Sequence, residues 1–214
     1  TLTLANGVKI PQLGLGTWFI DDANAAEAVK AAAKLGYRHF DTAQAYGNER
    51  GVGEGVRSCG VAREELFVVS KVAAEHKTYE AAKASIDATL QKMGLDYLDM
   101  MIIHSPQPWD KVNQCEDRYV EGNRAAWRAL EEAYKEGKLR AIGVSNFQIG
   151  DLNSLLEGCT VKPMVNQILL HISNTPLELV EFCQNNGIAV EAYSPIAHGE
   201  ILHQPEIQAM AEKY

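Results

Sequence analysis

The feature that most constrains the fold of this chain is a regular alternation between short apolar stretches and longer helical patterns. Seven strand-like segments occur, at residues 12–18, 37–42, 66–71, 97–104, 139–146, 164–168 and 188–194. Helical patterns lie between most of them, at residues 21–36, 78–94, 123–137, 149–158 and 175–187. Strands that alternate with helices are typical of a parallel sheet whose strands are joined by helical crossovers.

The strand ends provide a second constraint, because a residue with a polar group closes each segment. These residues are Trp18, Asp41, Lys71, His104, Asn146, Gln167 and Tyr193. Their spacing is close to the ~30 residues of one strand–helix–strand unit. The first turn carries no G-x-G-x-x-G pattern, which a doubly wound sheet would usually show. The sequence therefore predicts an α/β fold of the (β/α)8 TIM-barrel type, with its chemistry on the rim at the carboxyl ends of the strands.

The two ends of the sequence add a hairpin and an incomplete last unit. Residues 1–11 read as two short strands around Asn6-Gly7, a pair that favours a tight turn. Residues 205–214 form a helical pattern without a C-terminal cap, and no eighth strand is visible. A barrel of this type has eight units. We therefore expect residues 1–214 to be a single barrel domain that is incomplete at its C-terminus, and the native chain to be longer.

Charge and cysteine usage exclude several classes of partner. The formal net charge is −8 and the sequence pI is about 5.3. Such a balance argues against nucleic acid and anionic membranes as partners. The four cysteines form no C-x-x-C pair, so neither a metal site nor a redox motif is predicted. Without a signal-peptide pattern or a long apolar run, we expect a cytoplasmic protein with reduced thiols.

The segment HFDTAQAYGNE, at residues 39–49, contains the first candidate active-site residues. Asp41 falls where its strand ends and Tyr46 follows five residues later. Lys71 and His104 close the next two strands, so a barrel would bring all four groups to one side of its mouth. An ammonium beside a phenol lowers the phenol pKa, and a carboxylate keeps the ammonium charged and oriented. Such a group can protonate an oxygen on which negative charge develops.

Each of these residues also has an ordinary structural explanation. Asp41 alone could cap a turn, and Tyr46 could be a packed loop aromatic. Lys71 could be a solvated strand end, and His104 a hydrogen-bonded core residue. Their coincidence at equivalent strand ends favours a functional site. Ser145, Asn146 and Gln167 could either form turns or contact a ligand. The aromatic residues Tyr193, Trp18 and Trp109 could either pack in the core or form the walls of a ligand pocket.

Several motifs together resemble the aldo-keto reductase family, in particular its bacterial 2,5-diketo-D-gluconate reductase type. The matching segments are GLGTW, HFDTAQAYGNE, the strand ending in Lys71, GLDYLDMMIIHSP, GKLRAIGVSNF, VNQ and AYSP. They cover nearly the whole chain and are specific in combination. The resemblance implies a carbonyl reductase that uses NADPH, needs no metal and is a soluble monomer.

The resemblance also implies roles for individual residues. Asp41, Tyr46, Lys71 and His104 would form the catalytic tetrad. Ser145, Asn146 and Gln167 would hold the nicotinamide carboxamide, Tyr193 would stack on the ring, and the loop after Ser194 would lie along the pyrophosphate. Thr17 and Asp41 would also contact the cofactor. Substrate would contact Trp18, Tyr46, His104 and Trp109.

The chain departs from the family pattern at the pocket. Ser105 stands where many members have Trp, Val72-Ala73 where many have Leu-Trp, and Leu169 where many have Glu. The loss of two aromatic walls predicts a roomier or more polar site. Candidate substrates are small aldehydes, α-dicarbonyls, keto-sugars and aromatic aldehydes.

Three other functions are compatible with parts of the pattern. Lys71 could be the nucleophile of a Schiff-base aldolase. The chain could also bind a nicotinamide nucleotide without catalysis, because a fold does not fix a function. A metallohydrolase is weaker, because His104 and His171 lack partners for a metal site.

Overall fold

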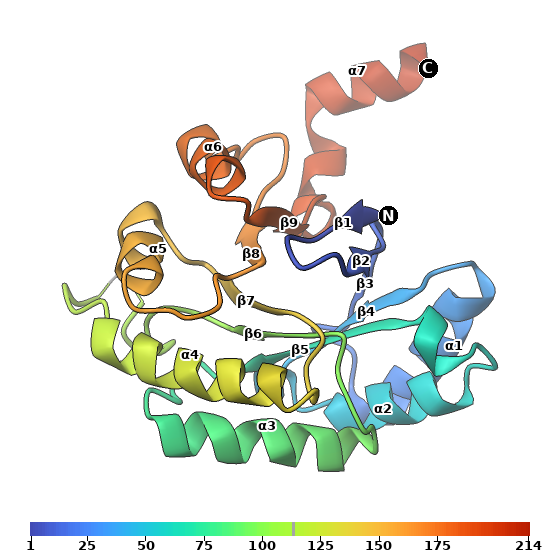
Figure 1. Ribbon diagram of the computed structural model, residues 1–214. Coiled ribbons are helices and arrows are strands. Elements are labelled where there is room, and N and C mark those ends of the chain that lie inside the picture. Colours follow the sequence, from blue (N-terminus) through green and yellow to red (C-terminus); the bar gives the residue numbers. More distant parts are fainter. Residues whose placement is uncertain (113) are drawn as a thin grey trace.

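The computed structural model describes residues 1–112 and 114–214 of the chain, and its centre is a seven-stranded parallel sheet. The strands follow one another in sequence order: β3 (Leu15–Gly16), β4 (His39–Asp41), β5 (Phe67–Val72), β6 (Met100–Ile103), β7 (Ile142–Ser145), β8 (Val165–Leu169) and β9 (Ala189–Tyr193). All seven predicted strands are confirmed. The sheet curves into a nearly closed barrel (Figure 1), and within the described residues no ladder joins β9 back to β3.

The predicted N-terminal hairpin is also confirmed. Strand β1 (Leu2–Thr3) pairs antiparallel with β2 (Lys9–Ile10). The turn is closed by the Gly7 amide, which donates to the carbonyl of Leu4 at 2.9 Å. In the Asn6-Gly7 pair only Gly7 takes a positive φ, of 86°. This matches a longer hairpin loop that ends in a left-handed glycine, rather than a two-residue turn.

Helices connect the strands, and six of them correspond to the predicted patterns: α1 (Asp22–Lys34), α3 (Tyr79–Met93), α4 (Val120–Lys135), α5 (Ile149–Leu156), α6 (Leu177–Asn185) and α7 (Pro205–Lys213). The Thr78 hydroxyl caps α3 by accepting from the Ala81 amide, and Gly94 ends that helix with a φ of 65°. The helical pattern predicted at residues 175–187 starts two residues too early for α6. That helix begins at Leu177 with Pro176 in the cap position, so Thr175 lies outside it.

The described residues also include three 3-10 helices: η1 (Gln44–Tyr46), η2 (Arg63–Glu65) and η3 (Ala197–His203). Helix η1 places Tyr46 directly after β4. Helix α7 stands apart from the body of the molecule in Figure 1. Segment η3 remains in contact with it, because His198 packs edge-on against Trp18 with ring centroids 5.4 Å apart. No residue of α7 is buried.

The sequence analysis missed one helix, α2 (Glu49–Ser58), whose sequence ERGVGEGVRS contains three glycines. Glycine lowers helix propensity, and this hid the helix. The glycines permit close packing between helices. A Cβ on Gly51 would lie 2.1 Å from the carbonyl oxygen of Asp22 in α1, and one on Gly53 would lie 2.2 Å from that of Met93 in α3. The close packing of α2 against α1 and α3 therefore outweighs its low intrinsic helix propensity.

This packing yields a stability prediction. Gly53→Ala should lower the free energy of unfolding by roughly 2–3 kcal/mol, because the added methyl meets backbone rather than a side chain that can move. The matched control is Gly150→Ala in α5, where a Cβ would meet nothing within 4 Å. This variant should be neutral or more stable by up to about 1 kcal/mol. Urea unfolding of both variants checks the pair, and equal effects would contradict the packing account.

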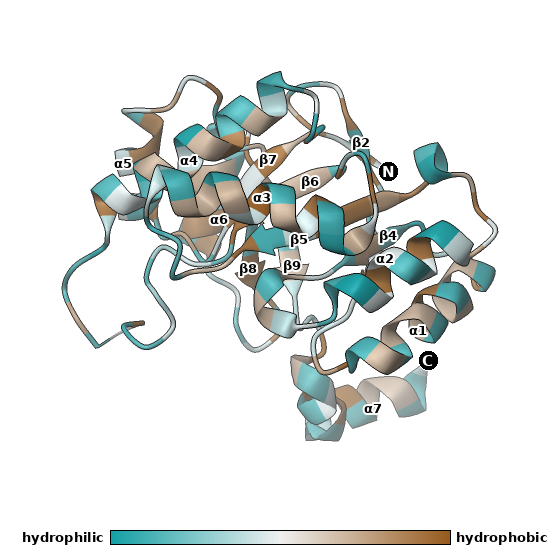
Figure 2. Cartoon of the chain, turned by 90° about the horizontal axis from the view of Figure 1, so that it is seen from below, coloured by the Kyte–Doolittle hydropathy of each residue, from teal (hydrophilic) through white to brown (hydrophobic). Residues whose placement is uncertain are grey.

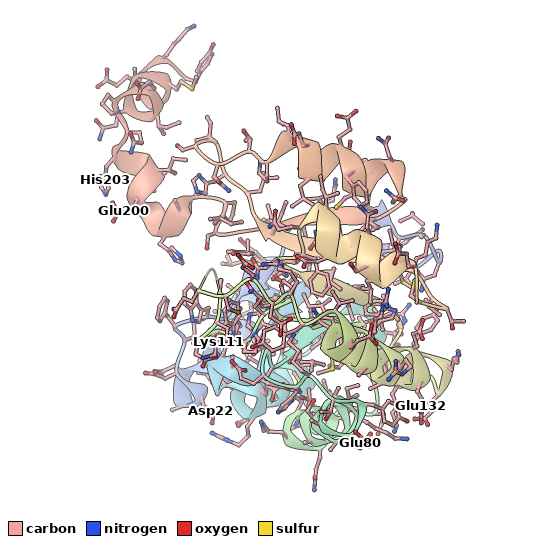
Figure 3. All side chains as sticks on the ribbon, turned by 90° about the vertical axis from the view of Figure 1, so that its left-hand side faces the viewer. Asp22, Glu80, Lys111, Glu132, Glu200 and His203 are labelled. Carbon is pink, nitrogen blue, oxygen red and sulfur yellow. The ribbon has the colours of Figure 1, made fainter. Side chains whose placement is uncertain are left out.

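The core lies between the sheet and the helices that cover it. Every residue of β5, β6 and β7 is buried. In Figure 2 brown apolar residues gather on the strands, and the helices carry teal residues outward. The labelled Asp22, Glu80 and Glu132 in Figure 3 lie on outer helix faces. No helix in the described part of the chain is long and apolar enough to cross a membrane.

Candidate active site

The carboxyl ends of β4 and β5 bring three of the predicted catalytic groups into direct contact. The ammonium of Lys71 donates to Asp41 Oδ1, to the carbonyl of Thr42 at 2.9 Å and to the Tyr46 hydroxyl at 3.2 Å. Lys71 is completely buried. The sheet register makes this meeting possible, because Asp41 lies opposite Val69 and the side chain of Lys71 projects from the same strand two residues further on.

The charge on Lys71 is maintained by its neighbours. Burial alone would lower the pKa of Lys71, but the attraction of Asp41 and Tyr46 and the hydrogen bonds to both outweigh it and raise the pKa above its ordinary value. Lys71 is therefore an ammonium across the physiological pH range. It provides a fixed positive charge beside the Tyr46 phenol.

The pKa of Tyr46 shows two opposing influences. Burial raises the pKa of Tyr46, the charge of Lys71 and its hydrogen bond lower it, and the charge of Asp41 raises it again. The balance is a raised pKa, so the expected net lowering is wrong for the protein alone. Lys71 acts in the predicted direction, but the cost of placing a phenolate in a half-buried site is larger. Tyr46 is consequently protonated at neutral pH and able to donate.

His104 follows β6 and faces the same group of residues. Its ring packs edge-on against Tyr46, with centroids 5.6 Å apart, and against Trp109 at 4.9 Å. Burial, and secondly the charge of Lys71, lower the pKa of His104 to about 3. The imidazole is therefore neutral. Its buried Nδ1 has no hydrogen-bond partner among the described residues. A neutral imidazole of this kind has one donor nitrogen and one acceptor nitrogen.

A buried network that the sequence analysis missed holds the segment after β4 in place. The Asn48 amide donates to the carbonyls of Thr17 and Ile20, each at 2.8 Å, and its oxygen accepts from the Thr42 hydroxyl at 2.6 Å. The Thr17 hydroxyl donates to the carbonyl of Asp41 at 2.9 Å. Asn48 is fully buried. Asn48 belongs to the segment HFDTAQAYGNE, which carries part of the family resemblance, and this place in the sequence was a signal. A buried amide normally takes part in a hydrogen-bond network.

A cavity of about 1040 Å³ opens beside these groups. Aromatic and imidazole side chains form part of its lining: Trp18, Phe19, Tyr46, His104, Trp109 and His198. Trp18 stacks near Tyr46 with ring centroids 6.4 Å apart. Trp18 is 50% and Trp109 42% exposed, so both are walls rather than core residues. A cavity with apolar walls and a few polar groups suits a small organic ligand.

Six of the residues predicted to bind the cofactor line the same cavity: Asp41, Ser145, Asn146, Gln167, Tyr193 and Ser194. The Asn146 amide donates to the carbonyl of His104 at 3.0 Å and accepts from the Tyr193 hydroxyl at 2.9 Å. Thr17 differs from this group, because it is fully buried and lies outside the cavity lining. Its hydroxyl is engaged by the hydrogen bond to the Asp41 carbonyl, and its expected contact with a cofactor stays a prediction.

One of the pocket departures, Ser105, lies outside the cavity lining, and the expected roomier or more polar site stays a prediction. Ser105 is buried, its hydroxyl accepts from the Gln107 amide and its carbonyl accepts from Lys77 at 2.8 Å. Trp109, four residues further along the loop, packs on His104 instead. An aromatic wall is thus present, but it comes from a different position of the chain.

Metal ligation is not suggested by the arrangement of side chains. Across residues 1–112 and 114–214, no group of three or more His, Cys, Asp and Glu side chains lies together as a candidate metal site. The four cysteines Cys59, Cys115, Cys159 and Cys183 are unpaired thiols.

Comparison with known proteins identifies the class. The profile of the Aldo/keto reductase family matches residues 12–211. Glyoxal reductase of Bacillus subtilis is 46% identical, with 100% of this chain and 74% of the relative aligned. Glycerol 2-dehydrogenase (NADP(+)) of Saccharomyces cerevisiae is 38% identical over 99% of this chain and 74% of its own length. The crystal structure of a Bombyx mori aldo-keto reductase in complex with NADP matches with a TM-score of 0.84 and 32% identity, covering 100% of this chain and 75% of that one.

The barrel, the polar groups at its carboxyl rim and these similarities define an oxidoreductase of the α/β-barrel class. The chain belongs to the Aldo/keto reductase family.

Proposed function

We propose that this protein is an NADPH-dependent carbonyl reductase that converts a small aldehyde, ketone, α-dicarbonyl or keto-sugar into an alcohol. The contact of the Lys71 ammonium with Asp41 and the Tyr46 hydroxyl, at the edge of a large cavity, is the observation that carries this proposal. The choice of NADPH draws on the yeast relative named for NADP(+) and on the Bombyx mori complex with NADP.

The proposed roles follow from the protonation states. A nicotinamide cofactor, when bound, supplies the hydride that adds to the carbonyl carbon. Tyr46 donates its hydroxyl proton to the carbonyl oxygen as negative charge develops there, and the resulting phenolate is stabilised by the Lys71 ammonium. Asp41 keeps Lys71 charged and oriented. His104 is neutral, so it orients the carbonyl oxygen with an N–H group rather than acting as an acid.

The chain offers a matching set of cofactor contacts. Ser145, Asn146 and Gln167 line the cavity with a hydroxyl and two amides, which suit a carboxamide. Tyr193 offers a ring face for stacking, and the loop after Ser194 offers backbone for phosphate contacts. Substrate would enter between Trp18 and Trp109 and meet Tyr46 and His104.

The aldolase alternative requires a different state of Lys71. A Schiff-base lysine must lose its proton to attack a carbonyl, whereas Asp41 and Tyr46 raise the pKa of Lys71. This supports reduction over covalent catalysis. Borohydride trapping in the presence of a carbonyl substrate separates the two functions, because only the aldolase would leave an adduct on Lys71.

A panel of carbonyl compounds assayed with NADPH and NADH tests the proposal. We expect oxidation of NADPH with at least one small aldehyde or dicarbonyl, and slower oxidation of NADH. Nucleotide binding without turnover on the whole panel would instead favour a non-catalytic binding protein.

We also propose that the enzyme acts in the cytoplasm as a monomer. The four unpaired thiols fit a reducing compartment, and the acidic charge balance fits a small-molecule substrate. Sedimentation in the presence and absence of NADPH measures the oligomeric state directly.

A further inference from the structure

The amide of Gln167 lies between two carboxylates at the floor of the cavity. Its Nε2 donates to Asp41 Oδ2 at 3.0 Å and to Glu191 Oε1 at 3.1 Å. Gln167 is 4% exposed and lines the cavity, as Asp41 and Glu191 also do. The sheet register places Gln167 of β8 directly opposite Glu191 of β9.

The chemistry of the two neighbours determines which way the amide is turned. An ionised carboxylate only accepts hydrogen bonds, and an amide has two N–H donors on nitrogen and one acceptor oxygen. In the structure the nitrogen end of Gln167 faces both carboxyl groups. Both donors are then used, and the carbonyl oxygen is the part of the Gln167 side chain that remains for a ligand.

Glu191 faces three titratable groups, of which His39 and Lys71 attract its carboxylate and Asp41 repels it. His39 of β4 places Nε2 3.6 Å from Glu191 Oε1, and Asp41 and Lys71 act on the same carboxylate through their charges. Burial raises the pKa of Glu191, followed in size by the opposing influence of His39. Its second oxygen has no hydrogen-bond partner among the described residues. A buried carboxyl oxygen without a partner costs folding free energy, so the presence of Glu191 beside Gln167 calls for an explanation other than stability.

We propose that Glu191 is a positioning residue that fixes the Gln167 amide with its carbonyl oxygen available to a hydrogen-bond donor on the ligand. This inference rests on the proposed function, since the carboxamide of a nicotinamide cofactor supplies such a donor. Without Glu191 the amide has one carboxylate neighbour instead of two, and the opposite orientation becomes accessible. Glu191 therefore makes the site selective for a ligand group that donates over one that only accepts.

Two nucleotides differ in the required way. NADP+ carries a carboxamide with N–H donors, and its 3-acetylpyridine analogue carries a methyl ketone without them. Binding of each can be followed without turnover by quenching of tryptophan fluorescence, because Trp18 and Trp109 line the cavity. We expect the dissociation constant of NADP+ from the native protein to be roughly tenfold lower than that of the analogue, which corresponds to one hydrogen bond to a fixed acceptor.

Substitutions should change this ratio in a defined pattern. Glu191→Leu should reduce the preference to about threefold or less, because the amide can turn. Glu191→Gln keeps an oxygen acceptor and should retain most of the preference. Gln167→Leu should bring the ratio near one, and adding Glu191→Leu to it should change nothing further, because the two residues act as one unit.

The outcomes separate this inference from the proposed function. Failure of the native protein to bind either nucleotide overturns both. An unchanged ratio in a folded Glu191→Leu protein overturns the positioning role alone, as does additivity with Gln167→Leu. If Glu191→Leu does not fold, Glu191→Ala replaces it, and the same ratio of dissociation constants is expected for it. Circular dichroism verifies the fold of each variant.

Discussion

Tyr46→Phe should lower kcat for carbonyl reduction by about 10²–10⁴-fold, the usual contribution of a general acid. The ring and its packing against His104 are kept, and only the hydroxyl that meets Lys71 at 3.2 Å is lost. Because the phenol serves the transition state, the dissociation constant of NADPH should be nearly unchanged. Steady-state kinetics and fluorescence titration measure the two quantities.

Tyr97→Phe is the matched control for this variant. The ring of Tyr97 lies under the Arg63 guanidinium at 4.1 Å, and phenylalanine keeps that stacking. Activity close to that of the native protein is expected for Tyr97→Phe. If Tyr46→Phe also retained activity within a few-fold, Tyr46 would not be the proton donor.

Lys71→Met should be comparably severe and should move the alkaline limb of the pH–rate profile. The charge and hydrogen bond of Lys71 lower the pKa of Tyr46. Without them that pKa rises further, and reduction requires the protonated phenol. Activity that is lost as pH rises should therefore be lost at a higher pH in the variant, measured on its residual rate.

Lys30→Met provides a control for loss of a lysine as such. Lys30 pairs with Glu27 on the surface of α1, and neither residue lines the cavity. Its replacement should leave the rate and the profile unchanged. If the residual activity of Lys71→Met showed the same alkaline limb as the native protein, Lys71 would not influence the pKa of Tyr46.

The fold was predictable where local pattern and barrel topology agree. The seven strands, and the meeting of Asp41, Tyr46 and Lys71, follow from counting units and strand ends. Helix α2 was not predictable in the same way, because Gly51 and Gly53 read as breaks until their contacts with Asp22 and Met93 are known.

The electrostatics of the site depended on information that a sequence does not contain. The direction in which Lys71 acts on Tyr46 follows from charge, but the larger influence of burial depends on the packed structure. The packing of Trp109 against His104 could not be predicted, because it depends on the path of the loop that follows β6. Glu191 did leave a signal, since an acid at an inward position of an apolar strand, two residues before Tyr193, is unusual.

Transfer of deuterium from NADPH labelled at nicotinamide C4 to a carbonyl substrate tests the central claim most directly. With the hydride position fully labelled, mass spectrometry of the alcohol should show one deuterium on the carbinol carbon, formed in step with loss of the reduced cofactor. The same assay with Tyr46→Phe should give the same labelled product at a greatly reduced rate. An unlabelled alcohol, or a product formed without any consumption of NADPH, would contradict the assignment of this protein as a carbonyl reductase.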